Sequence, residues 1–288
     1  MPELPEVEAL ARFLDEKTKG VEVAAVEVLS IAVLKTFDPP ADALAGHTVT
    51  GAWRRGKFLV LDVGPLHLVL HLARAGWVRW HDALKPAAGA RRPGKSPIAL
   101  RVRLSPGSGF EVTEMGHEKR LAAWVVRSPD DVPDLATLGI DPLDAAFDAG
   151  ALGRLLSDQR GQIKRVLTDQ RLVAGVGNAY SDEALHAARL SPFKPAANLT
   201  PEEVERLHHA LVEVLRDAVA RSAGLPAAGL KKEKKEGLRV HGRTGQPCPV
   251  CGDLVRQVAF SGKSLQYCPT CQTGGKPLAD RRFSKFLK

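Results

Sequence analysis

The feature that most restricts how this chain can fold is its set of four cysteines. They form two Cys-x-x-Cys pairs, Cys248/Cys251 and Cys268/Cys271, separated by sixteen residues, and the sequence holds no others. Each pair places two thiolates on a tight turn, and two such turns brought together complete a tetrahedral site for Zn²⁺. Four thiolates leave no open coordination position, so the one predicted zinc ion is structural. The alternating residues between the pairs predict a β-hairpin clamped by the metal.

The chain opens with Met1-Pro2-Glu3-Leu4-Pro5-Glu6. If Met1 is removed, the nitrogen of Pro2 becomes a free secondary amine beside the carboxylate of Glu3. An α-amino group titrates at roughly 7.7–8, so a useful fraction is a neutral nucleophile at cellular pH. Attack of this amine on a sugar C1′ would give an iminium ion, with Glu3 placed for proton transfer. The alternative is that Pro2 and Pro5 only prepare the start of a helix.

Length and composition predict a globular protein of one large or two ordinary domains, with 288 residues and 44% hydrophobic residues. No apolar run approaches the roughly 20 residues of a membrane helix, and the acidic start lacks the features of a signal peptide. We therefore expect a cytoplasmic protein with no membrane partner, and a monomer is the default expectation. In that compartment, disulfide bonds explain the four cysteines less well than a zinc site does.

Positive charge is concentrated at the end of the chain. Residues 231–288 carry 13 Lys or Arg against 4 Asp or Glu, whereas the whole chain has a net charge of +8. A basic C-terminal quarter on a near-neutral body favours a polyanionic partner. A tail that only improves solubility is an equally good explanation.

Hydrophobic periodicity divides the chain into a strand-rich half and a helical half. An amphipathic helix is predicted over residues 6–19, and a hinge rich in proline over 128–141. Short strands separated by Gly and Pro turns predict a β-sandwich. The predicted strands are 21–29, 48–52, 57–63, 67–72, 77–80, 98–104, 110–113 and 122–127. The predicted later helices are 144–158, 163–170, 178–188 and 201–223, the last capped by Thr200 and Glu203, followed by a Gly- and Lys-rich linker over 223–237.

Three further stretches are candidates for contact with an anion. The glycine turn VAGVGN, which ends at Asn178, offers the N–H groups of a helix start. Lys57 follows two arginines and runs into a strand, and the loop 116–121 carries Lys119 and Arg120. Each has an ordinary alternative: a helix–helix turn, a solvated strand edge and a charged turn. The same holds for His71, which would more often be a buried core histidine, and for loop 85–95 with its four cations, which is expected to be exposed.

Taken in order, PELPEVE, RRGKFL, VAGVGNAYSDEAL and HGRTGQPCPVCG resemble the formamidopyrimidine-DNA glycosylase / endonuclease VIII family, over roughly residues 1–272. The resemblance implies an α+β fold: an N-terminal β-sandwich flanked by helices, a helix–two-turn–helix domain and a C-terminal zinc-finger β-hairpin. The expected parts are a catalytic domain (1–127), a hinge (128–141), a helical domain with its basic linker (142–237), a zinc finger (238–272) and a basic tail (273–288).

The resemblance also implies a bacterial-type protein that acts in base excision repair of double-stranded damaged DNA and associates with the nucleoid through DNA. Such an enzyme flips the damaged nucleotide out of the duplex. Pro2 would displace the oxidised or ring-opened base through a Schiff base, Glu3 would transfer protons, and β-elimination would cut the strand. Glu6 would support the site, and Lys57 would lie near the sugar and phosphate. DNA contacts are implied for His71, Arg74, Lys119, Arg120, Asn178 and Lys263.

The sequence departs from the family pattern at several positions. Lys263 stands where the family has an arginine at the hairpin tip, which keeps the charge and loses the bidentate fork. Arg74, Lys119 and Leu121 match the positions that fill the gap left by the flipped base, where Met, Arg and Phe are typical. Segment 225–237 is short for the loop that covers oxidised guanine. Ring-opened purines, oxidised pyrimidines or abasic sites are therefore favoured over 8-oxoguanine.

Two other classes of protein remain open from the sequence. One is a catalytically weak zinc protein that binds lesions or abasic sites. The other is an RNA-binding zinc ribbon, which would explain the cysteines and the charge but not the N-terminal Pro-Glu.

Overall fold

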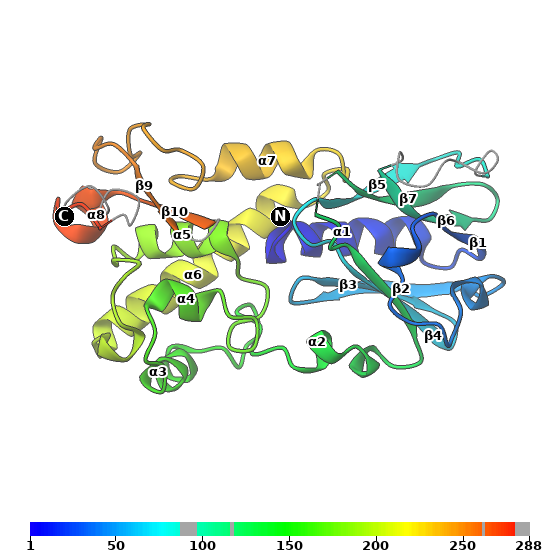
Figure 1. Ribbon diagram of the computed structural model, residues 1–288, viewed down its shortest axis with the longest axis horizontal. Coiled ribbons are helices and arrows are strands. Elements are labelled where there is room, and N and C mark those ends of the chain that lie inside the picture. The colour runs from blue at the N-terminus through cyan, green and yellow to red at the C-terminus, as the bar shows by residue number, and fades with distance from the viewer. Residues whose placement is uncertain (87–96, 116–117, 261–262, 280–288) are drawn as a thin grey trace. The chain divides into compact units, whose positions relative to one another are not determined.

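The computed structural model describes residues 1–86, 97–115, 118–260 and 263–279 (Figure 1). The chain forms two compact units, one of Met1–Thr137 with Ser222–Lys231 and the other of Leu138–Arg221 with Lys232–Lys288. Most of the basic loop expected over 85–95 lies outside the described residues, as does the end of the tail from residue 280. The domain limits expected from the sequence stay a prediction.

The first unit is built on two antiparallel four-stranded sheets. One has the strand order β1-β6-β7-β5 and the other β2-β3-β4-β8. Every predicted strand is present, with its ends displaced by a few residues at most. The strands are β1 (Val23–Val28), β2 (Val49–Arg55), β3 (Phe58–Val63), β4 (Leu66–His71), β5 (Gly76–His81), β6 (Ile98–Leu104), β7 (Gly109–Glu114) and β8 (Ala122–Val126). Short helical segments of this unit are η1 (Ile31–Val33), η2 (Ala41–Leu44), η3 (Pro129–Asp131) and α2 (Pro133–Ala136).

Helix α1 (Leu4–Thr18) lies between the two sheets (Figure 1). Its buried face carries Val7, Leu10 and Leu14, which share one hydrophobic core with residues of both sheets. The apolar positions recur at the helical spacing of three and four residues, so a single stripe faces the core. Because this stripe begins within the first turn, the start of the helix is buried along with its middle.

Polar contacts fix α1 against the edge of the second sheet. The guanidinium of Arg54 in β2 forms an ion pair with Glu8 at 2.8 Å. About two turns further along the helix, the carboxylate of Asp15 accepts a hydrogen bond from the backbone N–H of Ala52 at 2.9 Å. These two ties hold the helix in one register on the sheet.

A segment from late in the chain returns to this unit. Trp77 donates its Nε1–H to the carbonyl of Ala227 at 2.9 Å, and Ala227 and Leu230 are buried in the same core as α1. The ammonium of Lys231 lies 4.6 Å from the centroid of the Trp77 ring. An aromatic face attracts a cation in this geometry.

The linker expected over 223–237 is partly wrong, because its second half is helix α7 (Leu230–Gly237). Lysine and glutamate are good helix formers, and this stretch consists largely of them. Glu233 forms an ion pair with Arg221 at 2.5 Å, and Lys232 faces Glu236 one turn along. These charge pairs stabilise a helix in a segment whose composition predicts a flexible linker.

The second unit contains the predicted helices and the hairpin. Helix α3 begins five residues later than expected, because Asp148 caps it by accepting the N–H of Ala151 at 2.6 Å. The capping box of Thr200 and Glu203 is confirmed, with reciprocal hydrogen bonds of 2.9 and 3.3 Å. The elements are α3 (Ala149–Ser157), α4 (Ile163–Leu167), α5 (Asn178–Ala187), η4 (Ala196–Asn198), α6 (Pro201–Ser222), β9 (Arg256–Phe260), β10 (Lys263–Tyr267) and α8 (Pro269–Thr273).

The α+β class predicted from the sequence is therefore confirmed, with N-terminal sheets, a helical region and a C-terminal hairpin that carries the cysteines. Within the described residues, no helix combines the length and the apolar character needed to cross a bilayer.

Candidate functional site

The start of α1 is a buried, hydrogen-bonded turn that contains both N-terminal carboxylates. Glu3 is the N-cap residue, and its side chain accepts the N–H of Glu6. In return, the side chain of Glu6 accepts the backbone N–H of Glu3 at 2.8 Å. Glu3 is only 2% exposed, and Pro2 is also buried. This reciprocal capping box fixes the start of the helix directly after Pro2.

Lys57 and His71, both singled out in the sequence, lie close together at one end of the second sheet. Lys57 immediately precedes β3, whose first residue, Phe58, pairs with His71 in β4. Burial, together with the nearby charge of Lys57, lowers the pKa of His71 to about 4, although Asp134 acts in the opposite direction. At neutral pH the imidazole is therefore uncharged and can serve as a neutral hydrogen-bonding group beside a buried lysine.

The loop after β7 is organised by the carboxylate of Glu114. This buried side chain accepts the backbone N–H groups of Arg120 and Leu121 at 2.7 and 2.9 Å. The ammonium of Lys119 donates to the carbonyl of Glu114 at 2.8 Å. Lys119 and Arg120 are exposed at the surface of this loop, and residues 116 and 117 lie outside the described part.

Leu121 does not occupy the exposed position expected of a residue that fills a gap in DNA. Its side chain is 3% exposed and belongs to the core of the first unit. Met115 at the start of the same loop is 66% exposed, and its backbone N–H donates to the carbonyl of Ala75 at 3.3 Å. Ala75 follows Arg74, which is exposed in the turn between β4 and β5. Met115 thus presents an exposed apolar side chain, and its backbone is hydrogen-bonded to the turn that carries Arg74.

In the second unit, the glycine turn between α4 and α5 is held by one side chain. Gln170 donates its Nε2–H to the carbonyl of Val176 at 2.7 Å, and its Oε1 accepts the N–H of Gly175 at 3.0 Å. Gly175 has a φ of 85°, a conformation that glycine adopts readily. The turn delivers Asn178 to the first position of α5.

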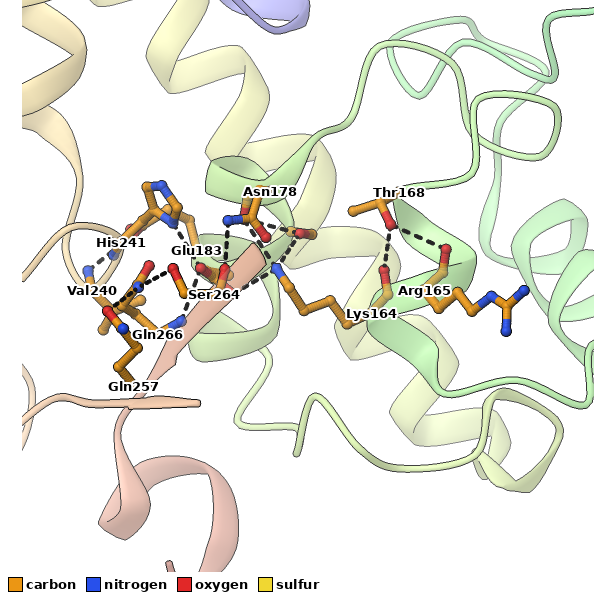
Figure 2. Close-up of polar contacts among 12 residues, drawn as sticks. Lys164, Arg165, Thr168, Asn178, Glu183, Val240, His241, Gln257, Ser264 and Gln266 are labelled. Carbon is orange, nitrogen blue, oxygen red and sulfur yellow. Dashed lines mark hydrogen bonds and ion pairs between the residues drawn. The ribbon is translucent and has the colours of Figure 1, made fainter. Parts of the chain in front are cut away.

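A buried ion pair joins α4 to α5, and its lysine, Lys164, is labelled in Figure 2. The ammonium of Lys164 in α4 is 2.6 Å from a carboxylate oxygen of Asp182 in α5, and it also donates to Ser181 and to the carbonyl of Asn178. Both charged side chains are buried. Sequence reasoning missed this pair; the available signal was a lysine between the apolar residues Ile163 and Val166 of a short helix.

The polar face of α5 also holds the zinc-finger segment (Figure 2). Asn178 donates its amide to the carbonyl of Ser264 in β10 at 2.7 Å. Asp182 accepts hydrogen bonds from the His241 ring at 2.7 Å and from the backbone of Gln266 at 3.1 Å. Asn178, which is predicted to contact an anion, therefore also connects the helix to the hairpin.

Glu183 completes this attachment by receiving three backbone N–H groups. Its carboxylate accepts from Arg239, Val240 and His241 at 2.8, 2.9 and 2.8 Å. Burial raises the pKa of Glu183, and the three hydrogen bonds act in the opposite direction. A carboxylate in this position fixes the chain where it enters the finger.

The four cysteines converge at the end of the finger. Their sulfur atoms all lie within 4.8 Å of one another, with Cys248 and Cys271 3.8 Å apart and Cys251 and Cys268 3.3 Å apart. Zn–S bonds of about 2.3 Å place the sulfurs of a tetrahedron about 3.8 Å apart. The separations exceed the roughly 2 Å of a disulfide bond, and the cluster is consistent with one structural zinc ion. Lys263, the predicted tip residue, begins β10 opposite Phe260, beside residues 261 and 262, which lie outside the described part.

Three family models match the chain: the formamidopyrimidine-DNA glycosylase N-terminal domain over residues 1–116, its H2TH domain over 138–227, and a zinc finger found in FPG and IleRS over 245–274. The chain belongs to the formamidopyrimidine-DNA glycosylase family.

Individual relatives agree with this assignment. The chain is 39% identical to the formamidopyrimidine-DNA glycosylase of Moorella thermoacetica, over 90% of this chain and 94% of that protein. It is 58% identical to an uncharacterized formamidopyrimidine-DNA glycosylase-like protein of Mycobacterium tuberculosis, over 54% of this chain and 98% of that protein.

Solved structures agree as well. The MutM (FPG) protein of Thermus thermophilus matches with a TM-score of 0.77 and 35% identity, over 96% of this chain and all of that chain. The Lactococcus lactis Fpg in complex with DNA that contains an abasic site matches with a TM-score of 0.82 and 27% identity, over 94% and 99% of the two chains.

Replacement of Lys164 by methionine should destabilise the protein. The variant leaves the buried carboxylate of Asp182 with its hydrogen bonds from His241 and Gln266 but without the ammonium. We expect the free energy of unfolding to fall by about 3 kcal/mol, because removing one partner of a buried ion pair leaves the charge of the other uncompensated. Urea unfolding of the zinc-loaded protein measures the change. Lys232→Met is the matched control, since Lys232 is 80% exposed, and it should change stability by less than about 0.5 kcal/mol. Equal effects of the two substitutions would show that the buried pair has no special role.

Proposed function

We propose that this protein is a bifunctional DNA glycosylase and abasic-site lyase that removes oxidised or ring-opened bases from double-stranded DNA. The observation that carries the proposal is the buried capping box at the start of α1. A catalytic amine at a chain terminus has to be held in place, and termini ordinarily fray. Here Glu3, the residue after Pro2, is hydrogen-bonded and buried, at the start of a helix enclosed between two sheets.

In the proposed reaction, the lone pair of the Pro2 nitrogen forms a bond to C1′ of the flipped nucleotide. The glycosidic C1′–N bond breaks, and the base leaves with that electron pair and takes up a proton delivered by Glu3. The Pro2 nitrogen then gives up its proton, and its lone pair forms the C=N bond as the C1′–O4′ bond breaks. The ring oxygen leaves with that electron pair and takes up a proton as a hydroxyl, and the positive charge of the resulting iminium ion acidifies the protons at C2′. A base removes one of them, and the 3′ phosphate leaves in β-elimination. Water then hydrolyses the iminium and frees Pro2.

The other predicted residues would bind and orient the DNA. Glu6 would hold Glu3 in position through the capping box, and Lys57 with His71 would receive the sugar and its phosphate. Asn178, at the first position of α5, would contact a phosphate at the helix start. The remaining proposed contacts come from loops and the hairpin: Arg74, Lys119, Arg120 and Lys263.

The choice of lesion is part of the proposal. The relatives' structures include Lactococcus lactis FPG with DNA that contains Fapy-dG or an abasic site, and MutM with DNA that contains carbocyclic 8-oxo-G. For this chain we favour ring-opened purines, abasic sites and oxidised pyrimidines over 8-oxoguanine, on the basis of its own sequence. Segment 225–237 is short, and its second half is helix α7 rather than a long loop. The expected domain limits, with residues 1–127 catalytic and 238–272 the finger, belong to the same proposal.

Trapping with borohydride tests the proposed chemistry. A duplex with one abasic site is incubated with protein that lacks Met1, and borohydride reduces the imine to a stable amine. We expect a covalent protein–DNA adduct and a cut strand. A protein with an N-terminal extension should give neither, because its Pro2 nitrogen is an amide, and Pro2→Gly should give far less.

The matched control is Pro5→Ala, which changes the other early proline and leaves the terminal amine intact. It should form the adduct as the parent protein does. If the parent protein binds the duplex and zinc yet forms no adduct, the lyase proposal fails, and a zinc protein that binds lesions without cutting becomes the better description.

His71 should contact DNA as a neutral group. Its pKa of about 4 keeps the imidazole uncharged at pH 5.5, where an ordinary histidine would be mostly protonated. We therefore expect His71→Gln to leave the salt dependence of binding unchanged at pH 5.5, with a non-cleavable abasic analogue in the duplex. Lys57→Gln should make the negative slope of log K against log salt shallower by about 0.9. A shallower slope in His71→Gln would contradict a neutral His71.

Met115 should supply the apolar contact that the buried Leu121 does not. Proteins that kink or open a duplex insert apolar side chains, methionine among them, between base steps. Met115→Ala should reduce excision of a base-paired lesion by about tenfold, a loss of about 1.4 kcal/mol in the transition state. Cleavage at a preformed abasic site should fall less, because no base has to leave the stack. Ile31→Ala, which alters an apolar side chain that is 74% exposed elsewhere on the unit, should match the parent protein on both duplexes.

A further inference from the structure

One face of helix α5 contacts the zinc-finger segment. Asn178, Asp182, Glu183 and His186 recur at spacings of four, one and three residues, which places them on the same side of the helix. Asn178 bonds to Ser264, and Asp182 bonds to His241 and Gln266. Glu183 bonds to the backbone of residues 239–241. His186 is the last member of the series, and its partner is a cysteine. Its ring Nε2 lies 3.2 Å from the sulfur of Cys248.

This contact is outside the metal's own coordination. His186 does not belong to the group of described residues whose ligand atoms all lie within 4.8 Å of one another, which consists of the four cysteines. Four thiolates already complete a tetrahedron around zinc. The imidazole therefore faces a ligand and not the metal.

The chemistry of the two atoms sets the direction of the hydrogen bond. A thiolate bound to a metal has lost its proton and can only accept. The hydrogen therefore lies on Nε2, and in a neutral imidazole Nδ1 is then an acceptor. In the described part of the chain Nδ1 has no hydrogen-bond partner, and the side chain is only 2% exposed. An apolar residue would fill this space without leaving an unpaired nitrogen, so the bond from Nε2 to sulfur is the feature that only histidine supplies here.

We propose that His186 is a positioning residue of the zinc centre, donating its Nε2–H to the thiolate of Cys248. The four thiolates outnumber the two positive charges of Zn²⁺, and a donor to one sulfur reduces the excess charge on that atom. The bond also fixes the Cys248 side chain relative to α5. Outer hydrogen bonds of this kind typically alter metal affinity by about 10- to 100-fold. The role is independent of the proposed catalysis, because it concerns the metal and the helix alone.

The direct test uses protein loaded with ¹¹³Cd²⁺ in place of zinc, with ¹⁵N-labelled histidine. If Nε2–H donates to the sulfur of Cys248, the ring proton should show a scalar coupling to ¹¹³Cd transmitted through the hydrogen bond and the Cd–S bond. The ¹⁵N shifts should show a protonated Nε2 and an unprotonated Nδ1. A proton on Nδ1, or a protonated Nε2 without coupling to the metal, would overturn the proposal.

Zinc release supplies the second test. A thiol-reactive oxidant such as hydrogen peroxide is added, and a chromogenic chelator reports the rate at which zinc leaves. We expect His186→Leu, which preserves bulk but not the donor, to release zinc about tenfold faster. His186→Gln, which can donate from its amide, should recover most of the loss.

The control is His208→Leu, because His208 also makes a ring hydrogen bond in this unit, at 2.7 Å to the carbonyl of Phe147, away from the cysteines. It should release zinc at the parent rate. Parent-like release from His186→Leu, or release from His186→Gln as fast as from His186→Leu, would refute the role of the donor. If His186→Leu does not fold, the ¹¹³Cd measurement on the parent protein still decides. Neither experiment contains DNA, so its outcome is separate from that of the lyase test.

Discussion

Helix α1 begins inside the core, and the rest of the first unit depends on that constraint. Its apolar stripe packs against both sheets, and Glu8 and Asp15 tie it to β2. A helix held this way along its length has no freedom at its first turn. Glu3 and Glu6 complete the arrangement by capping each other, which fixes the residue that directly follows Pro2. The same packing that stabilises the fold thus pre-organises the proposed nucleophile.

The second unit has to attach a small finger to its helical part. The finger holds two small apolar clusters, one around Val240 and Val255 and one around Val258 and Leu265. Polar side chains of α5 add hydrogen bonds between the helix and the finger. Buried charges are acceptable there because each has several partners, as Lys164 does with Asp182, Ser181 and Asn178. Hydrogen bonds have stricter geometry than apolar contacts. They therefore fix the orientation of the finger on the helix as well as holding it there.

Local patterns in the sequence predict much of this structure. Alternating apolar residues identify the eight strands, the capping box at Thr200 identifies the start of α6, and the Cys-x-x-Cys spacing identifies the metal centre. What the sequence does not reveal depends on partners far along the chain. The pairing of Lys164 with Asp182, the burial of Leu121 and the helix at 230–237 all follow from tertiary contacts or from charge pairs that composition conceals. The site residues stay predictions, because their roles appear only with DNA present.

The central claim is that the nitrogen of Pro2 forms the covalent bond to DNA. Proteolysis of the borohydride-reduced adduct, followed by tandem mass spectrometry of the peptide that carries the sugar remnant, locates that bond. The proposed mechanism predicts the remnant on the N-terminal peptide, at Pro2, with Met1 absent. A remnant on the ε-amine of Lys57, the buried lysine that precedes β3, or on any other lysine would contradict it.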